Sequence, residues 1–490
     1  MKTFLAVFAL SGLLIPLTTQ AATTITVTST ADSGPGSLRD AIATASSGDN
    51  IHFSVTGTIA LTTSALIVAK SVTISGPGAS NLAVSGSHAV QVFKVNSGAI
   101  VTISGLTIEN GSASGGGAGI FNLGTLTLNN STVSGNSTDS EGGGIFNAGT
   151  LTVTNTMVSG NSVSCCYGGG IFNEGTLAVT NSTVSGNSGN LFYGGGVFNQ
   201  GTLTLTNSTV SGNSVRLRYG GGIFNLGTLT VTNGTVAGNS VPFGGGGIGN
   251  FLGTLALKNT IVANSVLGGN CYNDQGTFSS QGHNLSDDGS CTSLLTNTGD
   301  KNGTPAGLDP SGLKDNGGPT PTIALLPASA GVDAVPTSPT DYCTQTDGAT
   351  PIEADQRGVA RPGGTSCDRG AFELVQTITV PIDIKPGENP APINPKSRGT
   401  IPVAILSSAT FDAVTQLDQT SLTFGRTGSE KSLAFCSGPQ DVNGDGLLDL
   451  VCHFDTPMTG FQAGNTVGML HGKTADGNSI MGTDSVIIVH

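Results

Sequence analysis

The sequence predicts an all-β protein: a right-handed parallel β-helix with about 26 residues per coil, followed by a smaller C-terminal β-sandwich. The first observation is a repeat in which the motif IFN recurs along the chain. Its Asn falls at steps of 25 or 26 residues, at Asn122, Asn147, Asn173, Asn199, Asn225 and, in a degenerate copy, Asn250. A second series, at steps of 26 residues, comprises Asn129, Asn155, Asn181, Asn207, Asn233 and Asn259. A period of this length indicates a solenoid, a propeller or an array.

Two further observations reduce this choice to a β-solenoid. The repeats are rich in Gly and β-branched residues and show no 3.6-residue pattern, which excludes helical repeats. Propeller blades need about 40 residues each, more than one repeat supplies. With 75 Gly and 10% charged residues the composition could indicate disorder. The strict period and the many Val, Leu, Ile and Phe argue against that interpretation.

Each repeat offers three short strands, in GGIFN, TLTVTN and TVSGN. In the second strand Leu177 and Val179 alternate with polar or small residues, so the apolar set is expected to face inward. Stacked coils pair their strands about 4.8 Å apart, and like residues form ladders. Asn at the corners can bond to the Asn of the next coil, and Gly supplies the positive φ of the turns.

Aromatic residues recur with the same period in two places. The loop between SGNS and GGG varies most, and variation confined to one edge of a solenoid is typical of a binding face. Tyr167, Tyr193 and Tyr219 end this loop at 26-residue steps, so their rings are expected to stack. They either pack on each other or form a platform for sugar rings or a partner surface. The Phe and Ile of IFN face opposite sides, and the sequence leaves open which row faces the core: Phe121, Phe146, Phe172, Phe198 and Phe224 form the Phe row.

The chain is predicted to be exported and to have several parts. Residues 1–21 have the charge, apolar run and small residues of a secretory signal peptide, with cleavage after Ala21. Residues 22–50 are predicted to cap the β-helix with a short amphipathic helix around Ser37–Thr44, and coils are predicted over 51–304. A Pro-rich and then strand-like stretch without the period predicts the β-sandwich over 376–490.

The expected location is secreted, extracellular or cell-surface. No segment after the signal peptide is apolar enough to span a bilayer, so no transmembrane segment is predicted. The net charge of −13 argues against nucleic acid as a partner. The expected partner of this predicted monomer is an extracellular glycan, or a matrix or surface protein.

The even number of cysteines indicates disulfides in an oxidising compartment. Three pairs lie close in the sequence and are predicted to bond locally: Cys271 with Cys291, Cys343 with Cys367, and Cys436 with Cys452. Each bond would close a loop worth about 3 kcal/mol in the chain-entropy model. Cys165 and Cys166 are adjacent, and either a vicinal disulfide or two free thiols fits the sequence.

Residues 441–449, DVNGDGLLD, predict a structural Ca²⁺ loop between strands. Asp441, Asn443, Asp445 and Asp449 stand at positions 1, 3, 5 and 9, with Gly446 at position 6. A hard cation needs several oxygens that converge from a tight turn, which this spacing can supply. The Glu expected at position 12 of an EF-hand is replaced by Cys452, which favours a loop between strands, as in integrin-like repeats, over a helix–loop–helix site. A Cys436–Cys452 bond would clamp the loop.

The sequence predicts no catalytic residue. A polysaccharide-cleaving site needs converging carboxylates, or a carboxylate, Ca²⁺ and a base on one face. The six charged residues between residues 112 and 269 do not converge in an obvious way: they are Asp139, Glu141, Glu174, Arg216, Arg218 and Lys258.

Three regions resemble known families. TVTSTADSGPGSLRDAI (26–42) resembles the CSLREA-type segment that caps secreted bacterial β-helices, with Gly36 in place of its leading Cys. The GGGIFN coils resemble polymorphic outer-membrane-protein repeats. DNGGPTPTIALLPASAGVDA (315–334), DQRGVARPGG (355–364) and CDRGAFE (367–373) resemble the choice-of-anchor Q segment. The resemblance implies a secreted or surface-displayed member of the pectin-lyase-like superfamily, in which 305–375 form the C-terminal end of the β-helix.

Three functions follow as hypotheses. The first is a non-enzymatic β-helix that acts in adhesion or extracellular interaction, by binding a glycan or matrix component. The second is a polysaccharide lyase or hydrolase of the pectin-lyase-like superfamily. The third is a structural extracellular scaffold.

Overall fold

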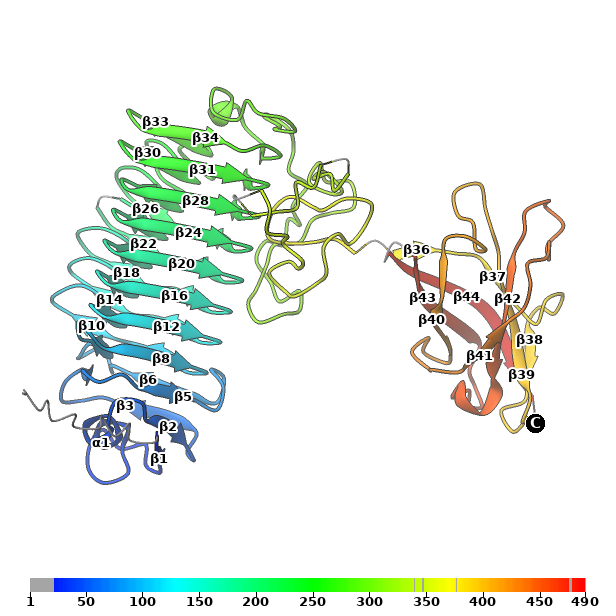
Figure 1. The fold of residues 1–490 in the computed structure, drawn as a ribbon, viewed down its shortest axis with the longest axis horizontal. Coiled ribbons are helices and arrows are strands. Elements are labelled where there is room, and N and C mark those ends of the chain that lie inside the picture. The colour runs from blue at the N-terminus through cyan, green and yellow to red at the C-terminus, as the bar shows by residue number, and fades with distance from the viewer. Residues whose placement is uncertain are drawn as a thin grey trace, which may run out of the picture.

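The computed structural model describes residues 22–191, 193–338, 340–345, 348–375, 377–475 and 478–489, and the predicted signal peptide lies outside them. These residues form a parallel β-solenoid and a C-terminal domain of two sheets (Figure 1), as the sequence predicts. Within this part of the chain, no helix has both the length and the apolar character needed to cross a membrane.

Four parallel sheets run along the solenoid, and each takes one strand from successive coils. Sheet A comprises β1 (Thr24–Val27), β2 (Asn50–Phe53), β5 (Thr73–Ser75), β8 (Ile100–Ser104), β12 (Thr125–Asn129), β16 (Thr150–Thr154), β20 (Thr176–Thr180), β24 (Thr202–Thr206), β28 (Thr228–Thr232), β31 (Thr254–Lys258) and β34 (Thr277–Ser280). Sheet B comprises β3 (Gly57–Ala60), β6 (Leu82–Ser85), β9 (Thr107–Glu109), β13 (Thr132–Ser134), β17 (Met157–Ser159), β21 (Thr183–Ser185), β25 (Thr209–Ser211), β29 (Thr235–Ala237), β32 (Ile261–Ala263) and β35 (Leu285–Ser286). Sheet C comprises β4 (Leu66–Val68), β7 (Phe93–Val95), β11 (Ile120–Asn122), β15 (Ile145–Asn147), β19 (Ile171–Asn173), β23 (Val197–Asn199), β27 (Ile223–Asn225), β30 (Ile248–Phe251) and β33 (Cys271–Asp274). Sheet D comprises β10 (Ser112–Ala113), β14 (Ser137–Thr138), β18 (Ser162–Val163), β22 (Ser188–Gly189) and β26 (Ser214–Val215).

The coils stack in register, so like residues lie on one another. Ile145 pairs with Ile171, and Leu151 pairs with Leu177. The inward-facing Ile and Leu of sheets A and C are buried, with Ile171 at 0% and Leu177 at 1% exposure. The sequence predicts three strands per coil, and sheet D adds a fourth in five coils. It forms because the two residues that follow the SGN motif still make backbone hydrogen bonds to the adjacent coil. One example is the 2.9 Å hydrogen bond from the Ser162 N–H to the Asn136 carbonyl.

Two ladders of buried Asn side chains run through the solenoid. Along the IFN ladder each Nδ2 donates to the Oδ1 of the next Asn at 2.7 Å. The SGN ladder repeats this at 2.9–3.0 Å through Asn136, Asn161, Asn187, Asn213 and Asn239.

The second Asn series has a different role from the one predicted. Its members turn the chain in the left-handed region with φ between +45° and +50°, which Asn tolerates better than most residues. The first residue of this series with positive φ is Asn130, and not Asn129 as the sequence predicted. Asn129 is the last residue of β12. The prediction that Gly supplies the positive φ of the turns is therefore incomplete.

Both ends of the solenoid are closed. At the N-terminal end the helix α1 (Leu38–Thr44) buries Leu38, Ala41 and Ile42, and the Oγ of Ser37 caps it by accepting the Asp40 N–H at 3.2 Å. At the other end the 3₁₀ helix η1 (Gly289–Cys291) is tied to β33 by the Cys271–Cys291 disulfide.

The segment 305–375 adds no coil, in contrast to the expectation that it ends the β-helix: its described residues form no regular strand. It lies beside the upper coils (Figure 1) and packs on sheet B. The Nδ2 of Asn207 donates to the Ala354 carbonyl at 2.7 Å, and the Oγ1 of Thr209 donates to the Oε1 of Gln356 at 2.7 Å. These contacts span about 147 residues of sequence, which a 26-residue period cannot reveal.

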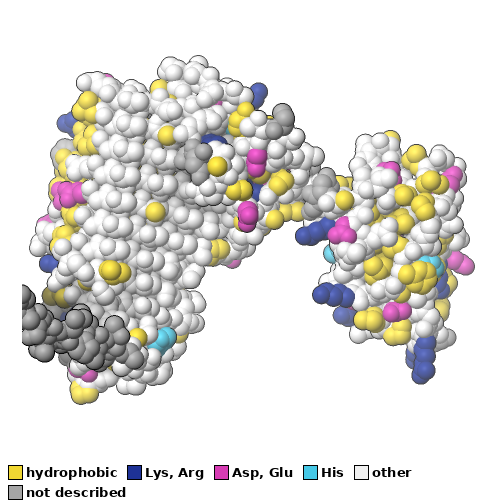
Figure 2. All heavy atoms as spheres, in the orientation of Figure 1, with side chains coloured by type: hydrophobic (Ala, Val, Ile, Leu, Met, Phe, Trp, Pro, Cys, Tyr) yellow, Lys and Arg dark blue, Asp and Glu magenta, His cyan; other side chains and the backbone are white. Residues whose placement is uncertain are grey.

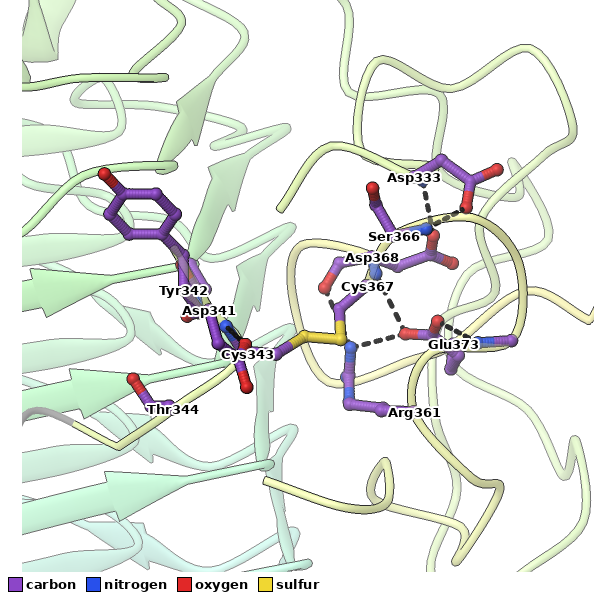
Figure 3. The surroundings of a disulfide bond; sticks show 12 residues. Asp333, Asp341, Tyr342, Cys343, Thr344, Arg361, Ser366, Cys367, Asp368 and Glu373 are labelled. Atoms are coloured by element: carbon purple, nitrogen blue, oxygen red, sulfur yellow. Dashed lines mark hydrogen bonds and ion pairs between the residues drawn. A yellow bond between two sulfur atoms is a disulfide. The ribbon is translucent and has the colours of Figure 1, made fainter. Parts of the chain in front are cut away.

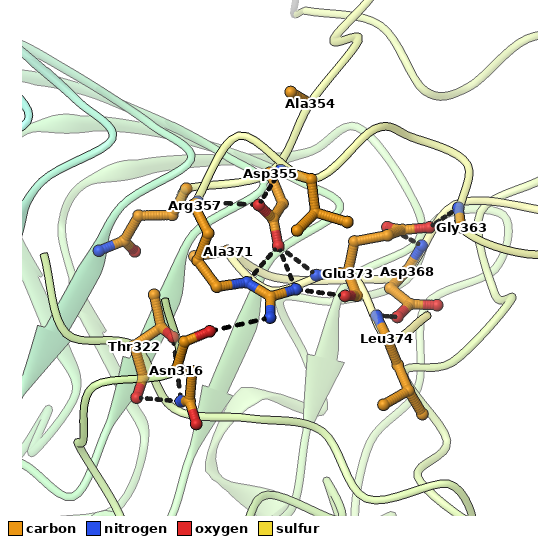
Figure 4. A network of polar contacts seen from close by, with 12 residues as sticks. Asn316, Thr322, Ala354, Asp355, Arg357, Gly363, Asp368, Ala371, Glu373 and Leu374 are labelled. Carbon is orange, nitrogen blue, oxygen red and sulfur yellow. Dashed lines mark hydrogen bonds and ion pairs between the residues drawn. The ribbon is translucent and has the colours of Figure 1, made fainter. Parts of the chain in front are cut away.

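Charged groups are buried inside this segment (Figure 4). The Nη1 of Arg361 lies 2.6 Å from the Oε2 of Glu373, and neither side chain is exposed. The Arg357 guanidinium lies 2.7 Å from the Oδ2 of Asp355. Burial and the neighbouring Glu373 carboxylate raise the pKa of Asp368 to about 7, against two backbone N–H donors that lower it. The Cys343–Cys367 disulfide lies next to this network (Figure 3).

The C-terminal domain is a sandwich of two sheets, as predicted. One sheet has the order β36 (Thr377–Thr379), β44 (Ser479–Ile488), β43 (Val467–Thr474) and β40 (Leu417–Gly425), with β38 (Ala391–Ile393) also paired to β44. The other has the order β37 (Ile382–Ile384), β39 (Thr400–Ile405), β42 (Leu450–Asp455) and β41 (Leu433–Cys436); the 3₁₀ helix η2 (Thr456–Met458) follows β42. A core that includes Phe424, Phe454 and Leu470 lies between the sheets.

All three predicted disulfides are present. The pairs Cys271–Cys291, Cys343–Cys367 and Cys436–Cys452 are bonded. The structure also resolves the alternative at Cys165 and Cys166, which form a vicinal disulfide.

Candidate functional site

The three tyrosines of the variable loop stack along one edge of the solenoid. Tyr167, Tyr193 and Tyr219 pair in register by isolated parallel bridges, each just before a Gly with positive φ. Their ring centroids are 5.8 and 6.1 Å apart. The backbone of each coil therefore positions one ring above the next, as the 26-residue step predicts.

The Phe row lies beneath these tyrosines and answers the question that the sequence left open. The Ile row faces the core, and the Phe row points outward. Phe198 and Phe224 are nevertheless buried, at 1% and 2% exposure, because tyrosines cover them. The Tyr167 ring lies 4.7 Å from the Phe198 ring, and the Tyr193 ring lies 4.4 Å from the Phe224 ring. Every tyrosine of the row is nevertheless half-exposed.

A groove of about 340 Å³ runs between the Tyr row and the outer side of sheet C. Its residues come from five successive coils: Tyr167, Tyr193, Phe198, Gln200, Arg218, Tyr219, Phe224, Leu226, Phe251, Tyr272 and Asp274. We call this feature the aromatic groove. On the side of the solenoid shown in Figure 2, charged side chains are sparse.

Tyr272 and Asp274 were not predicted as members of this site. Tyr272 aligns with Gly249, which aligns with Phe224, so it belongs to the Phe row. Because Gly249 carries no ring, the Tyr272 ring stacks on Tyr219 at 4.7 Å. The tripeptide CYN at 271–273 could have indicated this residue, because it is a degenerate copy of IFN. Its Asn follows the preceding ladder Asn by 23 residues instead of 25 or 26.

Polar groups lie within the aromatic groove. The Nη1 of Arg218 donates to the Tyr193 hydroxyl at 3.3 Å. The Tyr272 hydroxyl donates to the Oδ2 of Asp274 at 3.4 Å. Burial, with contributions from Tyr219 and Asp274, raises the pKa of Tyr272 to about 12, so its hydroxyl remains a donor at neutral pH. The groove therefore offers half-exposed aromatic rings together with one guanidinium, one carboxylate and several hydroxyls.

The other charged residues that the sequence singled out lie elsewhere. Arg218 is the member of that set that lines the aromatic groove. Lys258 is buried under the segment 305–375, where its Nζ donates to the Thr344 hydroxyl at 2.7 Å. Asp139, Glu174 and Arg216 are exposed, and Glu141 is half-buried.

The predicted Ca²⁺ loop is a tight turn held by its own side chains. Asp441 accepts the N–H groups of Gly444 and Gly446 at 2.7 and 3.0 Å. Asn443 and Asp445 lie with it at the exposed tip. Asp449 is placed apart from them: it is fully buried, and its two oxygens accept the N–H groups of Ser407 and Val442. Across the described residues, no three His, Cys, Asp or Glu side chains gather as a metal site.

The comparisons with known proteins give similarities to solved structures alone. No protein-family model matches the chain, and no curated protein matches it. Among solved structures, the chain is similar to the pectate lyase Pel9A, with 16% identity and a TM-score of 0.40 over 72% of this chain and 97% of that one. It is also similar to the PL6 family alginate lyase AlyGC, with 12% identity and a TM-score of 0.19 over 73% of this chain and 61% of that one.

Proposed function

We propose that the protein is an extracellular polysaccharide-binding β-helix that holds its ligand in the aromatic groove. The observation that carries the proposal is the pair of stacked aromatic rows, with half-exposed Tyr rings beside Arg218, Gln200 and Asp274. Aromatic faces bind the apolar side of a pyranose ring, and the polar groups can bond to its hydroxyls. Four disulfides support a location in an oxidising compartment.

Replacing Tyr193 by Ala is expected to weaken saccharide binding by roughly 2- to 12-fold, because one aromatic contact contributes about 0.5–1.5 kcal/mol. Tyr193 lies at the centre of the row, between Tyr167 and Tyr219. The measurement is a glycan array on the full chain, followed by calorimetry with the best saccharide.

Two variants control this experiment. Tyr193→Phe keeps the ring and removes only the hydroxyl that Arg218 contacts, so it should retain most of the affinity. Tyr342→Phe changes the one tyrosine that does not line the aromatic groove. Wild-type affinity in Tyr193→Ala, or no binding by the wild type to any glycan, would contradict the proposal.

Cleavage of the bound polysaccharide is the second candidate. Arg218, Tyr272 and Asp274 line the same groove. A carboxylate and a phenol can transfer protons, and a guanidinium can stabilise negative charge that develops on the substrate. Unsaturated or reducing ends released from a bound polysaccharide would support it, and their loss in Arg218→Ala and Asp274→Asn would assign the residues. Non-enzymatic adhesion to a matrix protein, expected from the sequence, gains no supporting observation from the structure.

We further propose that the loop 441–449 holds a structural Ca²⁺ ion. Asp441, Asn443 and Asp445 would supply oxygens from the exposed tip, and Asp449 would hold the loop on the sandwich through its bonds to Ser407 and Val442. The donor set, all oxygen on a turn with two positive-φ glycines, fits a hard cation.

Removal of Ca²⁺ is expected to lower the melting temperature of the C-terminal domain by a few degrees, because a ligand that binds only the folded state stabilises it. The measurement compares full-length protein in EDTA and in Ca²⁺ by calorimetry, with Asp445→Ala as the matched variant. Equal melting temperatures and no heat of Ca²⁺ binding would contradict this prediction.

A further inference from the structure

The vicinal disulfide Cys165–Cys166 stands at the beginning of the Tyr row. It directly precedes Tyr167, and the sulfurs of both cysteines lie against the Asp139 carbonyl of the preceding coil. Both cysteines are half-exposed. In each of the other three disulfides at least one partner is buried, with Cys291 and Cys452 at 0% and Cys367 at 1% exposure. Cys165–Cys166 is therefore the disulfide that a reductant in solution reaches first.

This bond does not stabilise the fold in the usual way. The other disulfides span 16, 20 and 24 residues, and they restrict the unfolded chain by closing those loops. A bond between adjacent residues closes no intervening loop. The loops of equal length before Tyr193 and Tyr219 contain no cysteine, yet both tyrosines pair in the same register as Tyr167. The effect of the bond is thus confined to its own loop.

The loop that contains Cys165 and Cys166 positions Tyr167, the first ring of the aromatic groove. At the matching position of the preceding coil the chain has Glu141, so the row begins at Tyr167. Tyr167 covers Phe198 and stacks on Tyr193, and it lines the groove. A covalent ring through Cys165 and Cys166 restricts the two residues that set the path of the backbone into Tyr167.

We propose that Cys165–Cys166 is a redox-sensitive latch that keeps Tyr167 in place for ligand binding, an inference that rests on the proposed function. A small extracellular thiol supplies the electrons. Its thiolate attacks one sulfur and breaks the S–S bond, and the other cysteine leaves as a thiolate and takes up a proton. A second reductant thiol then attacks the mixed disulfide. Two protein thiols and one oxidised reductant result, and the freed loop lets Tyr167 move from the groove.

The latch can be tested on the full chain, because its intrinsic fluorescence reports the groove. The protein has no Trp and five Tyr, four of which line the aromatic groove. Native protein is titrated with dithiothreitol, alkylated and analysed by peptide mass spectrometry, while Tyr emission and affinity for the best saccharide are followed. We expect Cys165 and Cys166 to be alkylated before the other six cysteines. Tyr emission should change, and affinity should fall about threefold to tenfold, the range for one aromatic contact.

The variant Cys165→Ser/Cys166→Ser isolates the bond. It should fold, show the weaker affinity without reductant, and no longer respond to dithiothreitol at low concentration. Hydrogen exchange in 164–168 gives a readout that needs no ligand, so it separates the latch from the proposed function if no saccharide binds. Prior reduction of another disulfide, or reduction that leaves exchange in 164–168 unchanged, would overturn the inference.

Discussion

Replacing Arg361 by Met is expected to destabilise the docked segment 305–375 by about 3–5 kcal/mol, the cost of leaving a buried charge without its partner. Arg361 lies 2.6 Å from Glu373, with both side chains inaccessible to solvent, and its guanidinium also donates to the carbonyls of Asp368 and Gly370. Asp355 and Asp368 add two more carboxylates to the same network (Figure 4). Without Arg361 the network would hold three acids and one remaining cation, Arg357.

The measurement is urea unfolding of the full chain together with limited proteolysis. Because the solenoid has its own core, we expect cleavage within 305–375 to begin at lower urea than unfolding of the coils. The control is Arg361→Met/Glu373→Met, which removes both charges and should be less destabilised than Arg361→Met alone. A single variant that loses less than about 1 kcal/mol would show that the ion pair does not hold the segment.

The sequence predicted the solenoid because its information is local and repeated. Each coil meets the same neighbour above and below, so the alternation of Leu177 and Val179 and the step from Asn173 to Asn199 determine the register. The same reasoning found the Tyr row. It left the Phe row undecided, because alternation alone does not reveal that tyrosines from a loop cover Phe198 and Phe224.

The features that sequence reasoning missed lack this periodicity. Tyr272 was missed because its coil has 23 residues and reads CYN. The docking of 305–375 depends on pairs such as Thr209 with Gln356, which nothing in the local pattern connects. From the sequence alone, Arg361 and Glu373 would be taken for two ordinary surface charges, because only tertiary packing buries them as a pair.

Replacing Asn199 by Ala, at the middle of the IFN ladder, is expected to cost about 3–5 kcal/mol. Asn199 is fully buried; its Oδ1 accepts the Asn173 amide, and its Nδ2 donates to Asn225 at 2.7 Å and to the Thr228 carbonyl at 3.1 Å. Ala removes these bonds, so the Asn225 Oδ1 and the Thr228 carbonyl on the following coil each lose a donor, at about 1–3 kcal/mol for each group left unsatisfied. The Asn173 amide loses one acceptor and keeps two backbone carbonyls. The measurement is equilibrium unfolding in urea, followed by tyrosine fluorescence.

Two further variants test whether the loss of stability in Asn199→Ala comes from the ladder or only from the loss of one amide side chain. Asn190→Ala, on an exposed loop, should change the stability by less than about 0.5 kcal/mol. Asn273→Ala, at the last rung, should cost less than Asn199→Ala, because Asn273 bonds to a ladder Asn on one side only. In a stack whose stability is a sum of neighbour contacts, an interior rung belongs to two interfaces and a terminal rung to one. Equal losses for Asn199→Ala and Asn273→Ala would mean that each Asn serves only its own turn, and that the ladder transmits no stability between coils.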